Sequence, residues 1–205
     1  MKPPKHTERS SQIRARLANW GFRSEVQQRI GALTVVWGIF ESNLETTIWA
    51  LRGEVVAGVR PSTDKSQVSD WIRQLAEDWP QFPSEARDVL RMASLAAFDL
   101  MEYRHAIVHG SMLPSPTMPT FIRNPRWHGE KRKRPGHDAH VDENLLDMAI
   151  DSGWVLCRVV FGARAACAEP ATVASLMELK QEVSRARSQT SELRHLTEMM
   201  NDEKY

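Results

Sequence analysis

Residues 30–51, IGALTVVWGIFESNLETTIWAL, decide the fold class of this 205-residue chain. Large apolar residues recur there every three or four positions, which is the spacing of one face of an α-helix. They are Ile30, Leu33, Trp37, Phe40, Leu44, Ile48 and Leu51. Because Gly53 and then Gly58 and Pro61 end the pattern, the sequence predicts one long helix that begins near Ser24.

Helical patterns continue along the chain after this predicted helix. Further segments with apolar residues at helical spacing cover residues 63–79, 84–109 and 142–168. Thr63 or Asp64 can cap the first of these helices, and Ser84 the second. A last segment after Pro170 has near-heptad spacing, which fits either docking onto the body or a coiled coil. The sequence therefore predicts an all-α bundle of about four to five helices.

Two segments do not follow this pattern. Residues 1–22 are polar and basic, and we expect a flexible tail. Residues 111–141 are rich in proline and basic residues, which favours an irregular insertion, with a short β-hairpin or a partly ordered loop, before the fourth helix. The predicted organisation is thus a basic tail, a helical domain over residues 23–168, and a C-terminal amphipathic helix or tail over residues 169–205.

The composition of the chain argues against several classes of protein. A formal net charge of +1 gives no overall attraction to nucleic acid. The cysteines, Cys157 and Cys167, would lie about 15 Å apart along one helix, too far to bridge. No apolar run approaches the length of a membrane span, and the N-terminus has no signal-peptide core. We therefore expect a soluble cytoplasmic protein with reduced thiols, no membrane association and no cofactor.

The most informative chemical motif is RHAIVHG, residues 104–110, at the end of the predicted third helix. His105 and His109 lie one helical turn apart, and Arg104 adjoins them. Gly110 is a natural residue for the position after a helix end. A permanent cation beside imidazoles that titrate near neutral pH can bind a phosphodiester and move protons without a metal. The motif therefore predicts phosphodiester chemistry at this helix end.

These residues resemble the motif of the HEPN superfamily (higher eukaryotes and prokaryotes nucleotide-binding domains). That motif is an Arg, four to six residues and a His, with a polar residue commonly right after the Arg; Arg104, His105 and His109 match it. The long first helix, with Trp37, Phe40 and the run from Glu41 to Leu44, is similar to bacterial members. The resemblance covers roughly residues 24–168.

The resemblance implies a metal-independent endoribonuclease, often the toxin of a toxin–antitoxin or defence system, that would have an antitoxin or other partner protein. Two protomers would pool their Arg/His pairs in one groove of a homodimer. Arg104 would bind phosphate, His109 would act as general acid and base, His105 would assist, and Glu41 would orient Arg104. Some HEPN toxins carry a tyrosine two positions after the motif His; Ser111 stands there, so regulation at such a tyrosine is not implied.

A basic run in the insertion is a candidate RNA contact. Its cations could follow an RNA backbone while an aromatic ring stacks on a base, although a solvated loop has the same composition. The residues concerned are Arg123, Arg126, Trp127, Lys131, Arg132, Lys133 and Arg134.

Two alternatives compete with catalysis. In the first, the domain is a non-catalytic dimerisation or binding module in which Arg104 pairs with Glu41 or Glu45 and His109 joins a structural polar network. In the second, His105 and His109 bind a metal with ligands from His137, Asp138 and His140. Because no Glu follows His105 and no carboxylate completes the pair, we expect no metal site.

Overall fold

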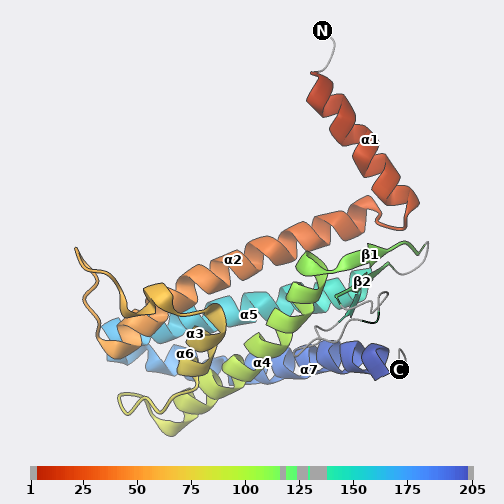
Figure 1. The fold of residues 1–205 in the computed structure, drawn as a ribbon. Helices are drawn as coiled ribbons and strands as arrows, with labels where there is room; N and C mark the ends of the chain where they lie inside the picture. The colour runs from red at the N-terminus through yellow and green to blue at the C-terminus, as the bar shows by residue number, and fades with distance from the viewer. Residues whose placement is uncertain (1–3, 116–118, 124–128, 130–137, 203–205) are drawn as a thin grey trace.

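The structure is a computed structural model that describes residues 4–115, 119–123, 129 and 138–202. In these residues the chain is almost entirely helical, with one small sheet (Figure 1). The prediction of an all-α protein with an irregular, strand-containing insertion before residue 142 is confirmed. The helices are α1 (Lys5–Asn19), α2 (Ser24–Arg52), η1 (Ser62–Lys65), α3 (Val68–Leu75), α4 (Ser84–His109), α5 (Glu143–Ala168), η2 (Pro170–Thr172), α6 (Val173–Glu178) and α7 (Lys180–Asp202). The described α-helices thus number seven instead of about four to five, because α1 and α6 were not expected.

Helix α2 packs along α5, which also contacts α4 and α7. Its predicted apolar face is buried, and Phe40, Leu44 and Ile48 are fully shielded from solvent. Each such side chain contributes about 1.5–3 kcal/mol through removal of its surface from water. The helix ends at Gly53, whose φ of 62° is the left-handed conformation that glycine adopts without strain. The long first helix predicted from Ser24 is confirmed.

Helix α7 packs along α4 and α5 (Figure 1). The small residues on its inner face, Ala186 and Thr190, are fully buried, and so is Leu193. Small side chains let the helix approach the bundle closely. Of the two arrangements that the near-heptad spacing left open, the structure shows docking onto the body.

The second predicted helix is shorter than its apolar pattern, and its cap was predicted wrongly. Instead of capping, the Thr63 hydroxyl donates to Glu45 Oε1 (2.7 Å) and accepts from Trp49 Nε1 (2.7 Å). Helix α3 begins after Gln67, where Gln67 and Asp70 satisfy each other's backbone N–H groups.

Ser84 was also predicted to cap a helix. It is instead the first residue of α4, and no side chain caps the backbone at that end. The hydroxyl of Ser84 lies 3.2 Å from the carboxylate of Glu85, which is its own neighbour in the first turn.

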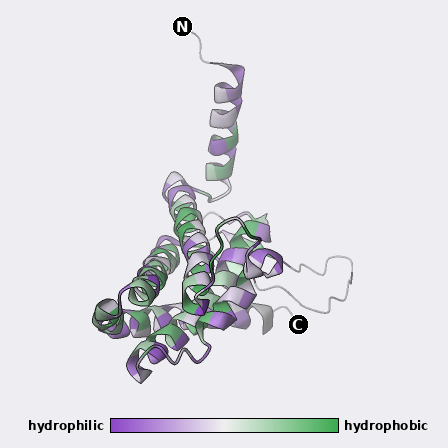
Figure 2. Cartoon of the chain, turned by 90° about the vertical axis from the view of Figure 1, so that its left-hand side faces the viewer, coloured by the Kyte–Doolittle hydropathy of each residue, from purple (hydrophilic) through white to green (hydrophobic). Residues whose placement is uncertain are grey.

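The N-terminal segment predicted as a flexible tail is helical. Helix α1 projects from the bundle (Figures 1 and 2), and none of its residues is buried. Ile13 is 59% exposed, and Trp20, just after the helix, is 43% exposed. Only three apolar residues of this segment, Ile13, Leu17 and Trp20, follow the helical spacing, so the signal for this helix is short.

The insertion forms a small antiparallel sheet of order β1-β2-β3. The strands are β1 (Ser111–Leu113), β2 (Thr120–Ile122) and β3 (Ala139–His140). Ser111 pairs with Ile122, and Thr120 pairs with His140. The hairpin predicted for this region is therefore present, and it begins directly after α4. Among the described residues, no helix is both long enough and apolar enough to cross a lipid bilayer.

Candidate functional site at the end of helix α4

The last turns of α4 are fixed by Tyr103. This side chain is only 2% exposed, and its hydroxyl donates a hydrogen bond to the backbone oxygen of His140 in β3 (2.8 Å). Burial raises the pKa of the Tyr103 hydroxyl, which therefore stays protonated and able to donate. The bond joins the end of α4 to the sheet and sets the position of the next residues, which carry the predicted site.

His105 and His109 contact each other, as their spacing predicts. Their ring centroids are 5.6 Å apart, and the rings meet edge to face. His105 is half-buried, whereas His109 is exposed. Burial lowers the pKa of His105, the positive charge of Arg104 lowers it further, and Glu102 opposes both effects. His105 is therefore an uncharged imidazole at neutral pH, and it contacts the exposed imidazole of His109.

Arg104 lies beside this pair, and the described residues offer it no hydrogen-bond or ion-pair partner. Its Nε is buried and has no hydrogen-bond acceptor. Within the described part of the chain, no hydrogen bond or ion pair joins Arg104 to Glu41 or to Glu45, whose carboxylate is bonded to Thr63. The structural ion pair expected for a non-catalytic module is thus not among the described interactions. The role of Glu41 in orienting Arg104 stays a prediction.

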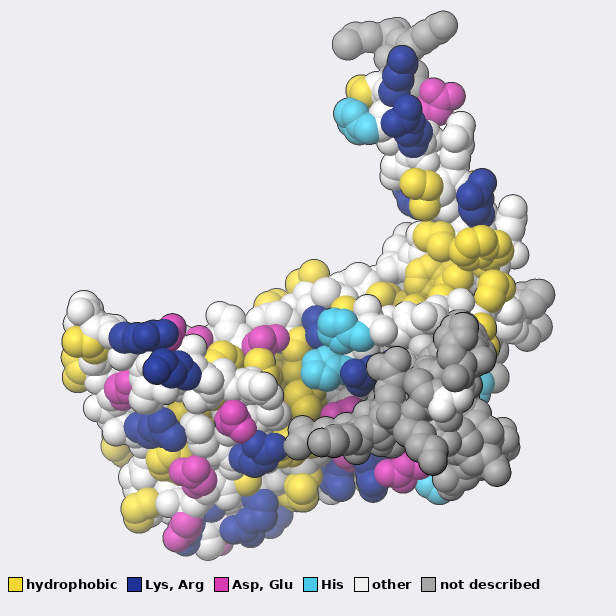
Figure 3. All heavy atoms as spheres, in the orientation of Figure 1, with side chains coloured by type: hydrophobic (Ala, Val, Ile, Leu, Met, Phe, Trp, Pro, Cys, Tyr) yellow, Lys and Arg dark blue, Asp and Glu magenta, His cyan; other side chains and the backbone are white. Residues whose placement is uncertain are grey.

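A space-filling view shows histidine side chains next to Lys or Arg side chains on one face of the molecule (Figure 3). In the described chain, His105 and His109 form a pair of histidines in edge-to-face contact. The end of α4 therefore offers imidazole and guanidinium groups together.

Gly110 matters for a reason other than the one its position predicts. Its φ of −82° lies outside the left-handed region. A Cβ at this position would lie 2.4 Å from the Ala106 carbonyl oxygen, 3.0 Å from the Cβ of Phe121 and 3.3 Å from the backbone nitrogen of Ile122. Glycine is required here because a Cβ would clash with the Ala106 carbonyl of α4 itself and would also press against β2.

The hairpin brings Arg123 to the same end of α4. Its backbone N–H donates to Oδ1 of Asp138 (2.9 Å), and Asp138 is fully buried. The charge of Arg123 is among those that lower the pKa of His105. Arg123 is thus the one predicted RNA-binding residue that the described structure includes. The others, Arg126, Trp127, Lys131, Arg132, Lys133 and Arg134, lie outside the described residues.

Two of the residues weighed as metal ligands, His140 and Asp138, make hydrogen bonds within the hairpin. The His140 ring nitrogen Nδ1 lies 2.8 Å from the Thr120 hydroxyl, and Asp138 holds the Arg123 backbone. In the described ranges, no three His, Cys, Asp or Glu side chains are arranged to hold a metal ion. His137 lies outside these ranges.

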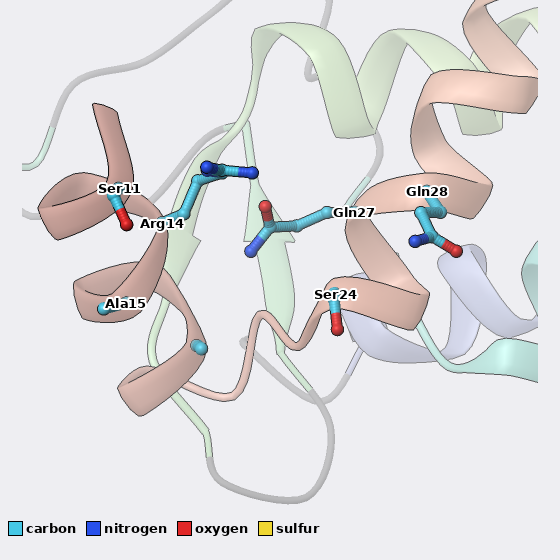
Figure 4. A pocket seen from close by; sticks show the side chains of 7 residues that line it. Ser11, Arg14, Ala15, Ser24, Gln27 and Gln28 are labelled. Atoms are coloured by element: carbon cyan, nitrogen blue, oxygen red, sulfur yellow. The ribbon is translucent and has the colours of Figure 1, made fainter. Parts of the chain in front are cut away.

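A polar cleft of about 500 Å³ lies between α1 and the start of α2 (Figure 4). Arg14 extends from α1 across this cleft towards Gln27 of α2. None of the predicted site residues lines it, and sequence reasoning missed it because residues 1–22 were expected to be a tail. The spacing of Ile13, Leu17 and Trp20 is the signal that could have indicated α1.

No family model, no curated protein and no solved structure matches the chain. The function is therefore inferred from the side chains gathered at the end of α4.

Proposed function

We propose that this protein is a metal-independent endoribonuclease with its site at the end of helix α4. The observation that carries the proposal is Arg104, whose buried Nε has no acceptor in the described structure, beside the edge-to-face pair of His105 and His109. A buried guanidinium N–H without an acceptor costs about 1–3 kcal/mol, which a phosphate oxygen would recover. The imidazoles next to it supply the groups that move protons.

The reaction needs only these groups. An imidazole takes the proton from a ribose 2′-hydroxyl, and the 2′-oxygen forms a bond to phosphorus. The bond between phosphorus and the 5′-oxygen breaks, and a protonated imidazole gives its proton to that oxygen. The products are a 2′,3′-cyclic phosphate and a free 5′-hydroxyl. Arg104 stabilises the negative charge on the phosphate oxygens as the new bond forms.

The exposure of the two histidines suggests how they divide this work. His109 is exposed and can reach a polynucleotide, so we assign it the general acid and base role. His105 is half-buried and uncharged at neutral pH, so it can accept a proton or a hydrogen bond from its neighbour. Each protomer contributes one such set, and we propose a homodimer in which two sets face one groove. An antitoxin or other protein partner and a cytoplasmic location belong to the same proposal.

The alternative, a non-catalytic module, places the same residues in a closed polar network. Such a network satisfies its buried polar atoms, because each unsatisfied atom is costly. The buried Nε of Arg104 is unsatisfied, and His109 is exposed. Because Nε of Arg194 is also unsatisfied in a structural ion pair, the exposure of His109 is the observation that favours a site that receives a ligand.

The test is incubation of the purified protein with single-stranded RNA in the presence of EDTA. We expect cleavage to fragments with 2′,3′-cyclic phosphate ends and no cleavage of the same sequence as DNA, which lacks the 2′-hydroxyl. His109→Ala should lower the rate at least about 100-fold, the usual contribution of a positioned acid or base. Because His109 is exposed, circular dichroism should show an unchanged fold.

His195, exposed on α7, provides the matched control. His195→Ala should cleave RNA at the wild-type rate. Cleavage that disappears with EDTA, or that persists in His109→Ala, would contradict the mechanism. RNA that stays intact with the wild-type protein would contradict the function.

A further inference from the structure

The pairing of β1 with β2 returns the chain to the end of α4. Ser111 is the first residue after the helix-ending Gly110, and it pairs with Ile122. In an antiparallel ladder the position after Ile122 therefore falls opposite Gly110. That position is Arg123. The short distance of 3.3 Å from the Gly110 Cβ position to the Ile122 nitrogen shows how closely the two segments approach.

Asp138 fixes the backbone at the point where β2 ends. The pairing of Phe121 with Ala139 places Asp138 at the end of the β2–β3 ladder. Its carboxylate accepts the Arg123 N–H at 2.9 Å, although the side chain is fully buried. A charged acceptor makes a hydrogen bond about twice as strong as a neutral one. A buried carboxylate is thus used to hold one specific backbone position beside α4.

The electrostatics of His105 agree with this placement. Arg104, Arg123 and His109 each lower the pKa of His105, and Glu102 is the acidic group that raises it. Two guanidinium groups from different elements therefore act on the same imidazole. One comes from the helix, and the other comes from the hairpin. A polyanion has negative charges at neighbouring positions, and these two guanidinium groups supply positive charges for two of them.

We propose that Arg123 is a second phosphate-binding cation of this site and that Asp138 is the positioning residue that holds it there. The inference rests on the proposed ribonuclease function and adds a substrate class to it. Arg104 binds the phosphate that is cleaved, and Arg123 binds the adjacent phosphate of the same strand. The preferred substrate is therefore an RNA strand with at least one phosphate next to the cleaved one.

The test compares two substrates that differ in this phosphate. One is a dinucleoside monophosphate, which has only the cleaved phosphate, and the other is a short single-stranded RNA. Arg123→Gln should raise KM for the RNA about tenfold and should change KM for the dinucleoside much less, because the dinucleoside has no adjacent phosphate. Arg123→Lys should restore most of the RNA affinity. Arg91→Gln, near the other end of α4, is the control and should behave as wild type.

Asp138 is tested through the same constants. Asp138→Ala should raise KM for the RNA as Arg123→Gln does, and adding Arg123→Gln to it should have little further effect. Asp138→Asn keeps an oxygen that can accept the Arg123 N–H, so KM should stay near the wild-type value. If the alanine variant does not fold, a tenfold rise in KM for Asp138→Asn overturns the positioning role, and an unchanged KM supports it.

A readout independent of cleavage separates this inference from the proposed function. Arg123→Gln should raise the pKa of His105, followed by NMR, because one of the lowering charges is removed. If the wild-type protein cleaves no RNA, the ribonuclease proposal fails, and binding of the same short RNA then decides. Binding about tenfold weaker in Arg123→Gln supports the second cation. Unchanged binding and an unchanged His105 pKa overturn it.

Discussion

Helix α4 carries two charged clusters. In the closed cluster, Asp99 is paired with arginines of another helix; the open cluster consists of Arg104, His105 and His109. Asp99 is 8% exposed and pairs with Arg187 and Arg194 of α7. Arg104 lies five residues further along the same helix and has no ion pair in the described structure. In the first cluster the charge of Asp99 is paired with cations of a neighbouring helix, whereas the described structure shows no ion pair of Arg104 in the second.

The energetics explain why the two clusters differ. Burial raises the pKa of Asp99, and the charge of Arg187 opposes that shift, so the ion pair offsets part of the loss of hydration. Nothing within the described chain offsets the buried Nε of Arg104. A phosphate oxygen bound at this guanidinium would satisfy that N–H. We therefore expect the two clusters to separate in experiments, the first affecting stability and the second affecting chemistry.

The largest expected effect comes from the open cluster. Arg104→Gln removes the cation that stabilises the developing phosphate charge, and we expect kcat/KM for RNA to fall about 100- to 1000-fold. Because Arg104 loses no partner among the described residues, the midpoint of thermal unfolding should change little. Cleavage assays and calorimetry on the same preparation measure both. A large loss of stability with normal cleavage by the folded fraction would instead make Arg104 a structural residue.

The second prediction concerns the close approach that joins the open cluster to the hairpin. Gly110→Ala places a methyl group 2.4 Å from the Ala106 carbonyl oxygen, so the backbone must shift. We expect a loss of about 2 kcal/mol in the free energy of unfolding and weaker RNA cleavage, since Arg123 moves with β2. Denaturant titration gives the first value.

Gly31→Ala is the matched control for this substitution. Nothing lies within 4 Å of its Cβ position on α2, so alanine should stabilise that helix by about 0.5–1 kcal/mol. If Gly110→Ala is as stable as Gly31→Ala, the close packing at Gly110 is not rigid and the argument from it fails.

The open cluster and Gly110 show which features the sequence could indicate and which it could not. The apolar face of α2 and the one-turn spacing of His105 and His109 are local patterns, so they predicted the long helix and the histidine contact correctly. The reason for Gly110 is only partly local. The Ala106 carbonyl lies one turn back on α4, but the contacts with Phe121 and Ile122 depend on the strand register.

The same distinction applies to the charged residues. The basic run pointed to Arg123 but could not rank it above the others, because its place beside α4 depends on Asp138. Asp138 was weighed as a metal ligand, since a carboxylate near histidines has that pattern in sequence. The pairing of Asp99 with Arg187 spans 88 residues, and no periodicity indicates it.

The third prediction tests the closed cluster. Asp99→Ala leaves Arg187 and Arg194 without their common partner, and we expect the free energy of unfolding to fall by about 1–2 kcal/mol, because both arginines can turn partly to solvent. The rate of RNA cleavage per folded molecule should not change. A double-mutant cycle with Arg187→Gln measures the coupling, expected at about 1 kcal/mol. Zero coupling would mean that the pair contributes nothing to holding α7 on α4.

The smallest expected effect is a pH dependence that arises in the open cluster. Burial and Arg104 lower the pKa of His105 below its ordinary value of about 6.5, so the unfolded chain binds a proton at a higher pH than the native protein does. The contribution of His105 to stability is therefore complete above about pH 6.5 and is lost as the pH falls through the lowered native pKa. Denaturant titrations across this range should show stability that rises with pH towards about 6.5, and a smaller rise in His105→Gln. An equal rise in the variant would assign the dependence to other groups. A rise that also shrinks in Arg104→Gln would show that the unpaired guanidinium acts directly on the imidazole beside it.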